Sequence, residues 1–376
     1  LPESQDVQGF NVWSLRALNG NAIKVTDFGA NVMSLKVGVS ELLWHKTNGE
    51  SVRLDNGLAV PGGMPFMFPW TSRIENGTLT LIDGRQVDLK KFPYIRKVPD
   101  AENGPNVLHG MTDKIRWNVV EGSDQHIVLS MKPRDIKIGA EGIETLAEVF
   151  GDVEAKLTYR IGDDGFNAGV EVTNLSLDKP AVLSFGFHPF FKLGDSLDGW
   201  SAQIPGATEY WLADGAQVPL KQRPLSVEGT EFDVRTPQVL DRAFEVGLTG
   251  LQADASGNIT SKFIHRDGRT LTVTQSREFK NLMFWVPLEN PNLPAGLASM
   301  QPTTSSANAI KMAEAGIAEA NPVRIPAQGA AAEPNKFSAS WGLQYLPASR
   351  SETRAREAEK DRKKVAVLGF DRMGVQ

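Results

Sequence analysis

The chain has 376 residues, of which 41% are hydrophobic and 23% charged, ordinary values for a globular protein of one large domain or two smaller ones. A net charge of −5 gives no broad basic surface, which argues against a nucleic-acid partner. The chain has no cysteine, which excludes disulfides, zinc–thiolate sites and cysteine nucleophiles, and no apolar run approaches the roughly 18 residues of a membrane span.

The first residue is Leu1, and the residues after it do not form the charged and apolar segments of a secretory signal. This start is typical of a mature chain from which a secretory signal has been removed. We therefore expect a periplasmic or secreted protein, with a cytoplasmic location as the alternative.

The first clear element is a hairpin over residues 77–89, where alternating apolar and polar residues flank Asp83-Gly84. A segment rich in glycine, proline and asparagine follows at residues 102–110 and contains His109. Such a composition predicts a loop, on which a polar side chain can face a cleft.

A second hairpin is predicted over residues 155–174, around Asp163-Asp164-Gly165. Beyond it, His188 ends the aromatic run of residues 182–188 and precedes Pro189. A histidine at a strand end beside apolar rings can have its pKa moved by burial, which suits acid–base chemistry. The alternative interpretation of either histidine is a hydrogen-bonded core residue.

A third hairpin is predicted over residues 263–274, with the turn at Asp267-Gly268. Short strands with such turns over more than 300 residues indicate an all-β sandwich or barrel. The sequence has no series of strands that alternate with long amphipathic helices, so we do not expect a parallel sheet. No Gly-x-Gly-x-x-Gly segment follows a strand, and we expect no cofactor.

The C-terminal part departs from the strand pattern. Residues 306–319 are rich in alanine and predict a short helix that Gly316 weakens. Residues 349–364 carry dense mixed charge, typical of a solvated helix or a disordered end, and the apolar residues 365–370 follow. We therefore expect a domain over residues 1–346 and a charged tail over 347–376, in which residues 365–370 would be a docking segment for the domain or a protein partner.

Several motifs, taken in order, resemble the aldose 1-epimerase (galactose mutarotase) family. The resemblance is carried by residues 62–74, 106–110 with Trp117, 186–191, 229–235 with 240–244, and 284–287 with 300–302. Together with residues 326–329 they cover most of the chain from Gly62 to Gly329. The resemblance implies a large antiparallel β-sandwich of the galactose mutarotase type with few short helices.

The resemblance also implies roles for particular residues. His188 would be the acid at the ring oxygen of a sugar, and His109 would hold or polarise the same region. Arg73 and Asp241 would bind sugar hydroxyls, since a guanidinium offers several donors and a carboxylate accepts hydroxyl hydrogens. Trp285 would stack on a sugar face, unless it is a core residue.

The chain departs from the family pattern at the general base. The family has a glutamate before proline near the end of a late strand, and this chain has Gln301-Pro302. A glutamine side chain can bind an anomeric hydroxyl but cannot take its proton near neutral pH. Glu75 is a conceivable replacement base, or otherwise a solvated turn carboxylate.

Three functional hypotheses follow from these residues. The first is an aldose 1-epimerase-like enzyme that interconverts the anomers of a hexose or related sugar. The second is an inactive relative that binds a sugar or glycan. The third is a structural or accessory protein on the same fold. The expected partner is a small-molecule sugar or a glycan for the first two hypotheses and a protein for the third.

Overall fold

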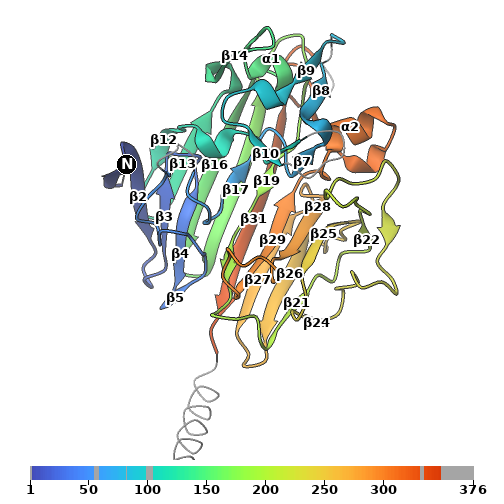
Figure 1. Cartoon of the computed structure of the whole chain (residues 1–376). Coiled ribbons are helices and arrows are strands. Elements are labelled where there is room, and N and C mark those ends of the chain that lie inside the picture. The colour runs from blue at the N-terminus through green and yellow to red at the C-terminus, as the bar shows by residue number, and fades with distance from the viewer. Residues whose placement is uncertain (1, 55–58, 82, 99–104, 331–333, 349–376) are drawn as a thin grey trace, which may run out of the picture.

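The computed structural model describes residues 2–54, 59–81, 83–98, 105–330 and 334–348, and its largest element is a nine-stranded sheet (Figure 1). Its strands in spatial order are β12 (Asn118–Gly122), β13 (His126–Met131), β16 (Val153–Gly162), β17 (Gly165–Asn174), β31 (Lys336–Leu346), β27 (Thr270–Ser276), β26 (Asn258–His265), β21 (Trp200–Gln203) and β24 (Gln238–Val239). The last strand among the described residues, β31, lies near the middle of this sheet, paired with β17 and β27.

A second sheet of eight strands packs on the first. Its strands are β23 (Leu225–Ser226), β22 (Glu209–Tyr210), β25 (Phe244–Thr249), β28 (Asn281–Val286), β29 (Leu297–Thr303), β19 (Gly186–Phe187) and β6 (Phe66–Met67), with β20 (Phe191–Lys192) also paired to β29. Phe263 of the first sheet contacts Phe284 and Phe191 of the second, with ring centroids 6.4 and 5.9 Å apart. The pairings within both sheets are antiparallel, so the expected all-β sandwich is confirmed.

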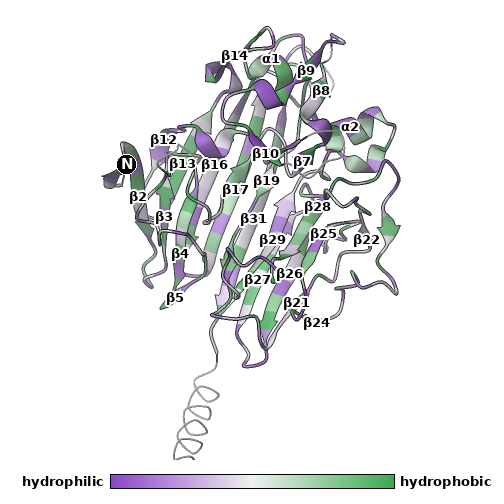
Figure 2. Ribbon diagram, viewed as in Figure 1, coloured by the Kyte–Doolittle hydropathy of each residue, from purple (hydrophilic) through white to green (hydrophobic). Residues whose placement is uncertain are grey.

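The strands form because their apolar residues alternate with a period of two (Figure 2). In β28, Leu282, Phe284 and Val286 are buried between the sheets, whereas Met283 and Trp285 on the other face are only partly buried. The second sheet thus buries one face in the core and leaves the other to line a site.

Smaller elements surround the sandwich. The N-terminal strands form a five-stranded sheet that lies beside β12 and β13 (Figure 1), namely β1 (Ser4–Val7), β2 (Phe10–Arg16), β3 (Ala22–Thr26), β4 (Val32–Val37) and β5 (Ser40–Glu41). The remaining strands are β7 (Arg73–Ile74), β10 (Arg96–Val98) and β11 (Asn106–Leu108) in one sheet, and the pairs β8 (Thr78–Thr80) with β9 (Gln86–Asp88), β14 (Lys137–Ala140) with β15 (Ile143–Thr145), and β18 (Ala181–Leu183) with β30 (Val323–Ile325). The helices are α1 (Ala147–Phe150), α2 (Ala309–Glu314) and the short 3-10 turns Glu75–Gly77, Leu89–Lys91, Thr112–Lys114, Pro133–Asp135 and Ala318–Ala320.

The three predicted hairpins are confirmed as β8–β9, β16–β17 and β26–β27. The alanine-rich segment contains α2, which ends at Glu314, two residues before Gly316 takes a φ of 86°. The charged tail and its apolar end at residues 365–370 lie outside the described residues. In the part of the chain that is described, no helix is both long and apolar enough to cross a membrane.

Candidate functional site

His109 is held on a tight turn directly after β11. Its backbone N–H donates to the carbonyl of Ser72 at 2.8 Å, and its φ of 61° lies in the left-handed region that non-glycine residues rarely adopt. Gly110 follows with a φ of 70°, and a Cβ at this position would lie 2.0 Å from the carbonyl oxygen of Phe68. The glycine therefore allows the close approach that fixes the direction of the His109 side chain.

His188 lies between β19 and β20, where its backbone N–H donates to the carbonyl of Pro65 at 3.0 Å. Its ring stacks on Phe190 with centroids 4.3 Å apart and meets the edge of Trp285 at 5.5 Å. Only 8% of the residue is exposed. Phe190 and Trp285 thus form aromatic walls around this imidazole.

The structure brings the two histidines together, with ring centroids 5.3 Å apart and ring planes nearly perpendicular. Burial lowers the pKa of His188 to about 3, and the nearby guanidinium of Arg96 also disfavours the charged form. The pKa of His109 is held well below its usual range, mainly by burial and also by His188 and the cations of Arg96 and Arg73. Both imidazoles are therefore neutral at neutral pH.

Gln301 on β29 contacts His188 directly. Its Nε2 lies 3.3 Å from Nε2 of His188, and only 3% of the residue is exposed. An amide N–H can only donate, so His188 accepts at Nε2 and carries its proton at Nδ1. This Nδ1–H has no hydrogen-bond partner on any other described residue.

Arg73 on β7 pairs through its backbone with Leu108, next to His109, and its Nη1 lies 3.2 Å from Oε1 of Glu245 on β25. The exposed side-chain fractions are 14% for Arg73 and 36% for Glu245. This ion pair joins the small sheet that carries His109 to the large sheet that carries Gln301.

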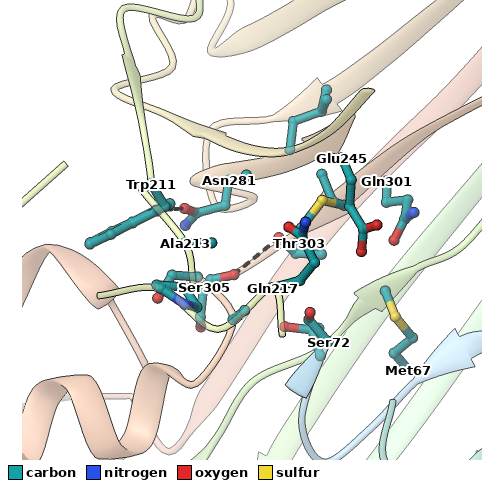
Figure 3. Close-up of a pocket in the computed structure, with 17 residues that line it drawn as sticks. Met67, Ser72, Trp211, Ala213, Gln217, Glu245, Asn281, Gln301, Thr303 and Ser305 are labelled. Carbon is teal, nitrogen blue, oxygen red and sulfur yellow. Dashed lines mark hydrogen bonds between the residues drawn. The ribbon is translucent and has the colours of Figure 1, made fainter. Parts of the chain in front are cut away.

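Figure 3 shows a pocket that is lined by Ser72, Glu245 and Gln301. Three residues that line it also contact the site residues already described: Ser72 bonds to His109, Glu245 to Arg73, and Gln301 to His188. Other lining residues include Met67, Thr71, Asn281, Met283, Thr303 and Ser306. The walls combine apolar surface with hydroxyl, amide and carboxylate groups, a composition that suits a polar organic ligand.

Several buried polar atoms at this end of the sandwich have no hydrogen-bond partner among the described residues. They include Thr71 Oγ1, Arg73 Nε, His109 Nδ1, His188 Nδ1, Asn281 Nδ2 and Ser306 Oγ. Buried polar atoms in proteins are usually hydrogen-bonded, because leaving one unpaired costs about 1–3 kcal/mol. A ligand with many hydroxyl groups would supply the missing partners.

The other residues predicted from the sequence have different surroundings. Trp285 is partly buried and meets the rings of both His188 and Phe190 edge-on. Asp241 is exposed between β24 and β25 and does not line the pocket. Glu75 lies outside the pocket lining, with its carboxylate 3.1 Å from Lys221 Nζ. Across the described residues, no three or more His, Asp or Glu residues are grouped to hold a metal ion.

Two charged residues near the histidines were missed from the sequence. Glu245 occupies an ordinary alternating position of β25, and Arg96 occupies one of β10. Neither belongs to a local motif, and only the strand pairing brings them near the site. The one available signal was the position of Glu245 directly after residues 240–244, which matched the family.

The model of the protein family described as aldose 1-epimerase matches residues 11–329 of this chain. Among proteins of curated function, none matches the chain significantly in sequence.

Solved structures with the same fold include proteins from several organisms. An aldose epimerase homologue from C. elegans has a TM-score of 0.67 at 15% identity, with 90% of this chain and 100% of that chain covered. A galactose mutarotase-like protein from Clostridium acetobutylicum has a TM-score of 0.67 at 18% identity, covering 92% and 98%. A galactose 1-epimerase from Lactobacillus acidophilus has a TM-score of 0.65 at 13% identity, covering 92% and 97%. At these identities the likeness shows the fold.

Proposed function

Because the chain belongs to the aldose 1-epimerase family, we propose that it binds the ring form of an aldose beside the histidine pair and interconverts the α and β anomers of that sugar. The observation that carries this proposal is the pair of Nδ1 atoms on His109 and His188. Both are buried and have no hydrogen-bond partner among the described residues, and the centroids of their rings are 5.3 Å apart.

Interconversion requires the sugar ring to open and close again. The anomeric hydroxyl loses a proton, the bond between C1 and the ring oxygen breaks, and the ring oxygen gains a proton. The aldehyde then turns about the C1–C2 bond and closes on its other face. Each assisted proton transfer is worth roughly 10²–10⁴-fold in rate.

The role of His188 in this scheme follows from its neutral state. A neutral imidazole with its proton at Nδ1 donates a hydrogen bond to the ring oxygen as negative charge develops there. Gln301 stabilises this tautomer by donating to Nε2. His109, whose ring lies against that of His188, orients the same part of the sugar.

Gln301 also favours a second candidate function, namely sugar binding without turnover. The resemblance places a glutamate at this position, and an amide cannot act as the base. In this case the site holds the sugar through the same contacts, and the anomers exchange only at the spontaneous rate.

The test uses a panel of pure anomers of common aldoses, followed by polarimetry and by NMR exchange spectroscopy. Wild type should accelerate the exchange of at least one aldose, and His188→Phe should lose roughly 10²-fold or more of that acceleration. No acceleration with any aldose would overturn the proposal. Sugar-induced quenching of tryptophan fluorescence in that case would identify the binding function.

A further inference from the structure

We propose that Glu245 is the general base that takes the anomeric proton. The family resemblance gives this role to a glutamate at residue 301, where this chain has a glutamine. The inference rests on the proposed anomer interconversion. It assigns the transfer of the anomeric proton, which the amide of Gln301 cannot accept.

The strand pairing places Glu245 and Gln301 on the same face of the second sheet. Glu245 of β25 pairs with Trp285 of β28, which pairs with Ser299 of β29. Directly paired residues of antiparallel strands point to the same side, and so do residues two apart along one strand. Gln301 is two residues after Ser299, so its side chain shares the face of Glu245. Figure 3 shows the carboxylate and the amide directed into the same part of the pocket.

Glu245 is also placed beside the residues that flank the histidine pair. Its cross-strand neighbour Trp285 meets the ring of His188 at 5.5 Å. On the other side, its Oε1 contacts Arg73, which pairs with the residue before His109. The carboxylate therefore lies between the two elements that hold the histidines.

The ion pair with Arg73 orients the carboxylate without using all of it. Arg73 Nη1 lies 3.2 Å from Oε1, and no described residue donates a hydrogen bond to Oε2 of Glu245. Arg73 acts here as a positioning residue, because it fixes one oxygen and leaves the other to face the pocket. The exposed fraction of 36% also leaves the side chain open to a ligand.

The other candidate carboxylates have less suitable positions. Glu245 is the only carboxylate among the described residues that line the pocket. Glu75 is paired with Lys221 outside the lining residues, and Asp241 is exposed and also outside them.

The protons of the step balance with one carboxylate side chain and one water molecule. Glu245 takes the proton of the anomeric hydroxyl as C1=O forms and the bond from C1 to the ring oxygen breaks. His188 donates a hydrogen bond to the freed ring oxygen. The proton on Glu245 then passes through a water molecule to that oxygen, which restores the carboxylate. Ring closure on the other face of the aldehyde reverses these steps.

The test compares anomer exchange by wild type, Glu245→Gln and Glu245→Asp on the aldose that wild type turns over fastest. Glu245→Gln should lower kcat by roughly 10²-fold or more. Glu245→Asp, which keeps the carboxylate, should retain part of the rate. Glu171→Gln is a matched control, because Glu171 is 39% exposed, is paired with Lys336 and does not line the pocket, and it should leave kcat unchanged.

A second carboxylate supplies the rescue. Adding Gln301→Glu to Glu245→Gln should return roughly 10²-fold in kcat, because it places a base on the same sheet face.

Arg73→Lys should retain more of kcat than Arg73→Gln, while the sugar affinity of the two changes less than their kcat. Sugar binding by Glu245→Gln, measured by tryptophan fluorescence, shows that the variant is folded.

The outcomes separate the two proposals. If wild type accelerates exchange and Glu245→Gln keeps the wild-type kcat, Glu245 is not the base and the proposed function stands. If wild type accelerates exchange of no aldose, both proposals are overturned. A loss in Glu245→Gln that Gln301→Glu restores supports the assignment.

Discussion

The Nε2 of Gln301 lies 3.3 Å from the Nε2 of His188, and this contact sets the tautomer of an imidazole that burial keeps neutral. An amide stabilises the neutral ring with its proton at Nδ1. A carboxylate at the same place would instead attract a second proton to the ring.

Gln301→Glu should therefore raise the pKa of His188, because a negative charge beside the ring favours the imidazolium form. The pKa of this histidine in wild type is lowered to about 3 by burial. NMR titration of the histidine ring signals measures the change. Gln301→Met, which is neutral and of similar length, should leave the titration low. Identical His188 titrations in Gln301→Glu and wild type would show that residue 301 does not set the charge of the ring.

Gly110→Ala should destabilise the protein and abolish sugar binding. The new Cβ would lie 2.0 Å from the Phe68 carbonyl oxygen, so the turn that carries His109 has to move. We expect a loss of about 3 kcal/mol or more in the free energy of unfolding. Urea unfolding and tryptophan fluorescence measure the two effects.

Gly139→Ala is the matched control for that substitution. Gly139 has a similar φ of 62°, but a Cβ there would meet nothing within 4 Å. This substitution should lower the free energy of unfolding only by the left-handed backbone strain, about 1 kcal/mol. It should leave sugar binding intact. Equal losses in the two variants would show that backbone strain, and not the contact with Phe68, dominates at Gly110.

The free energy of unfolding should fall as the pH drops below 6.5, because buried histidines stay neutral in the folded protein and take up protons on unfolding. Burial lowers the pKa of His45 to about 4 and that of His188 to about 3, below the ordinary value of 6.5. A folded pKa below the unfolded one gives stability that is present above 6.5 and lost as the pH falls toward 4 and 3.

His45→Gln isolates one of these contributions away from the pocket. Between pH 7 and pH 5 the variant should lose about 2 kcal/mol less stability than wild type, because one histidine fewer takes up a proton on unfolding. Urea unfolding at the two pH values measures the difference. A loss equal to that of wild type would exclude His45 as a source of the acid sensitivity.

A chain that ends at Ala348 should keep the melting temperature of the full protein within about 2 °C. The last described strand, β31, ends at Leu346, which pairs with Thr270 of β27 before the tail begins. Calorimetry measures the stability, and light scattering should detect the change in association that we expect from loss of the charged and apolar tail. A large drop in melting temperature would show that the tail packs on the sandwich.

The hairpins could be predicted because Asp-Gly turns and alternating residues are local signals, as at Asp83-Gly84. The two histidines could be identified from motifs, although the 5.3 Å between their rings is set by long-range strand pairing. Glu245 could not be identified in this way. Its contact with Arg73 spans 172 residues of sequence, and its position near Gln301 depends on the register of three strands. Local patterns carry no information on such a register.

The central place of β31 also constrains the order in which the protein folds. This strand, the last one in the described part of the chain, pairs with β17 on one side and β27 on the other. Until it arrives, the edges of β17 and β27 lack their partner, and the two halves of the nine-stranded sheet cannot join. Pairings this distant in sequence slow folding and expose unpaired strand edges to aggregation. Refolding from denaturant should accordingly be slow and sensitive to protein concentration, and nascent chains that stop short of β31 should require a chaperone.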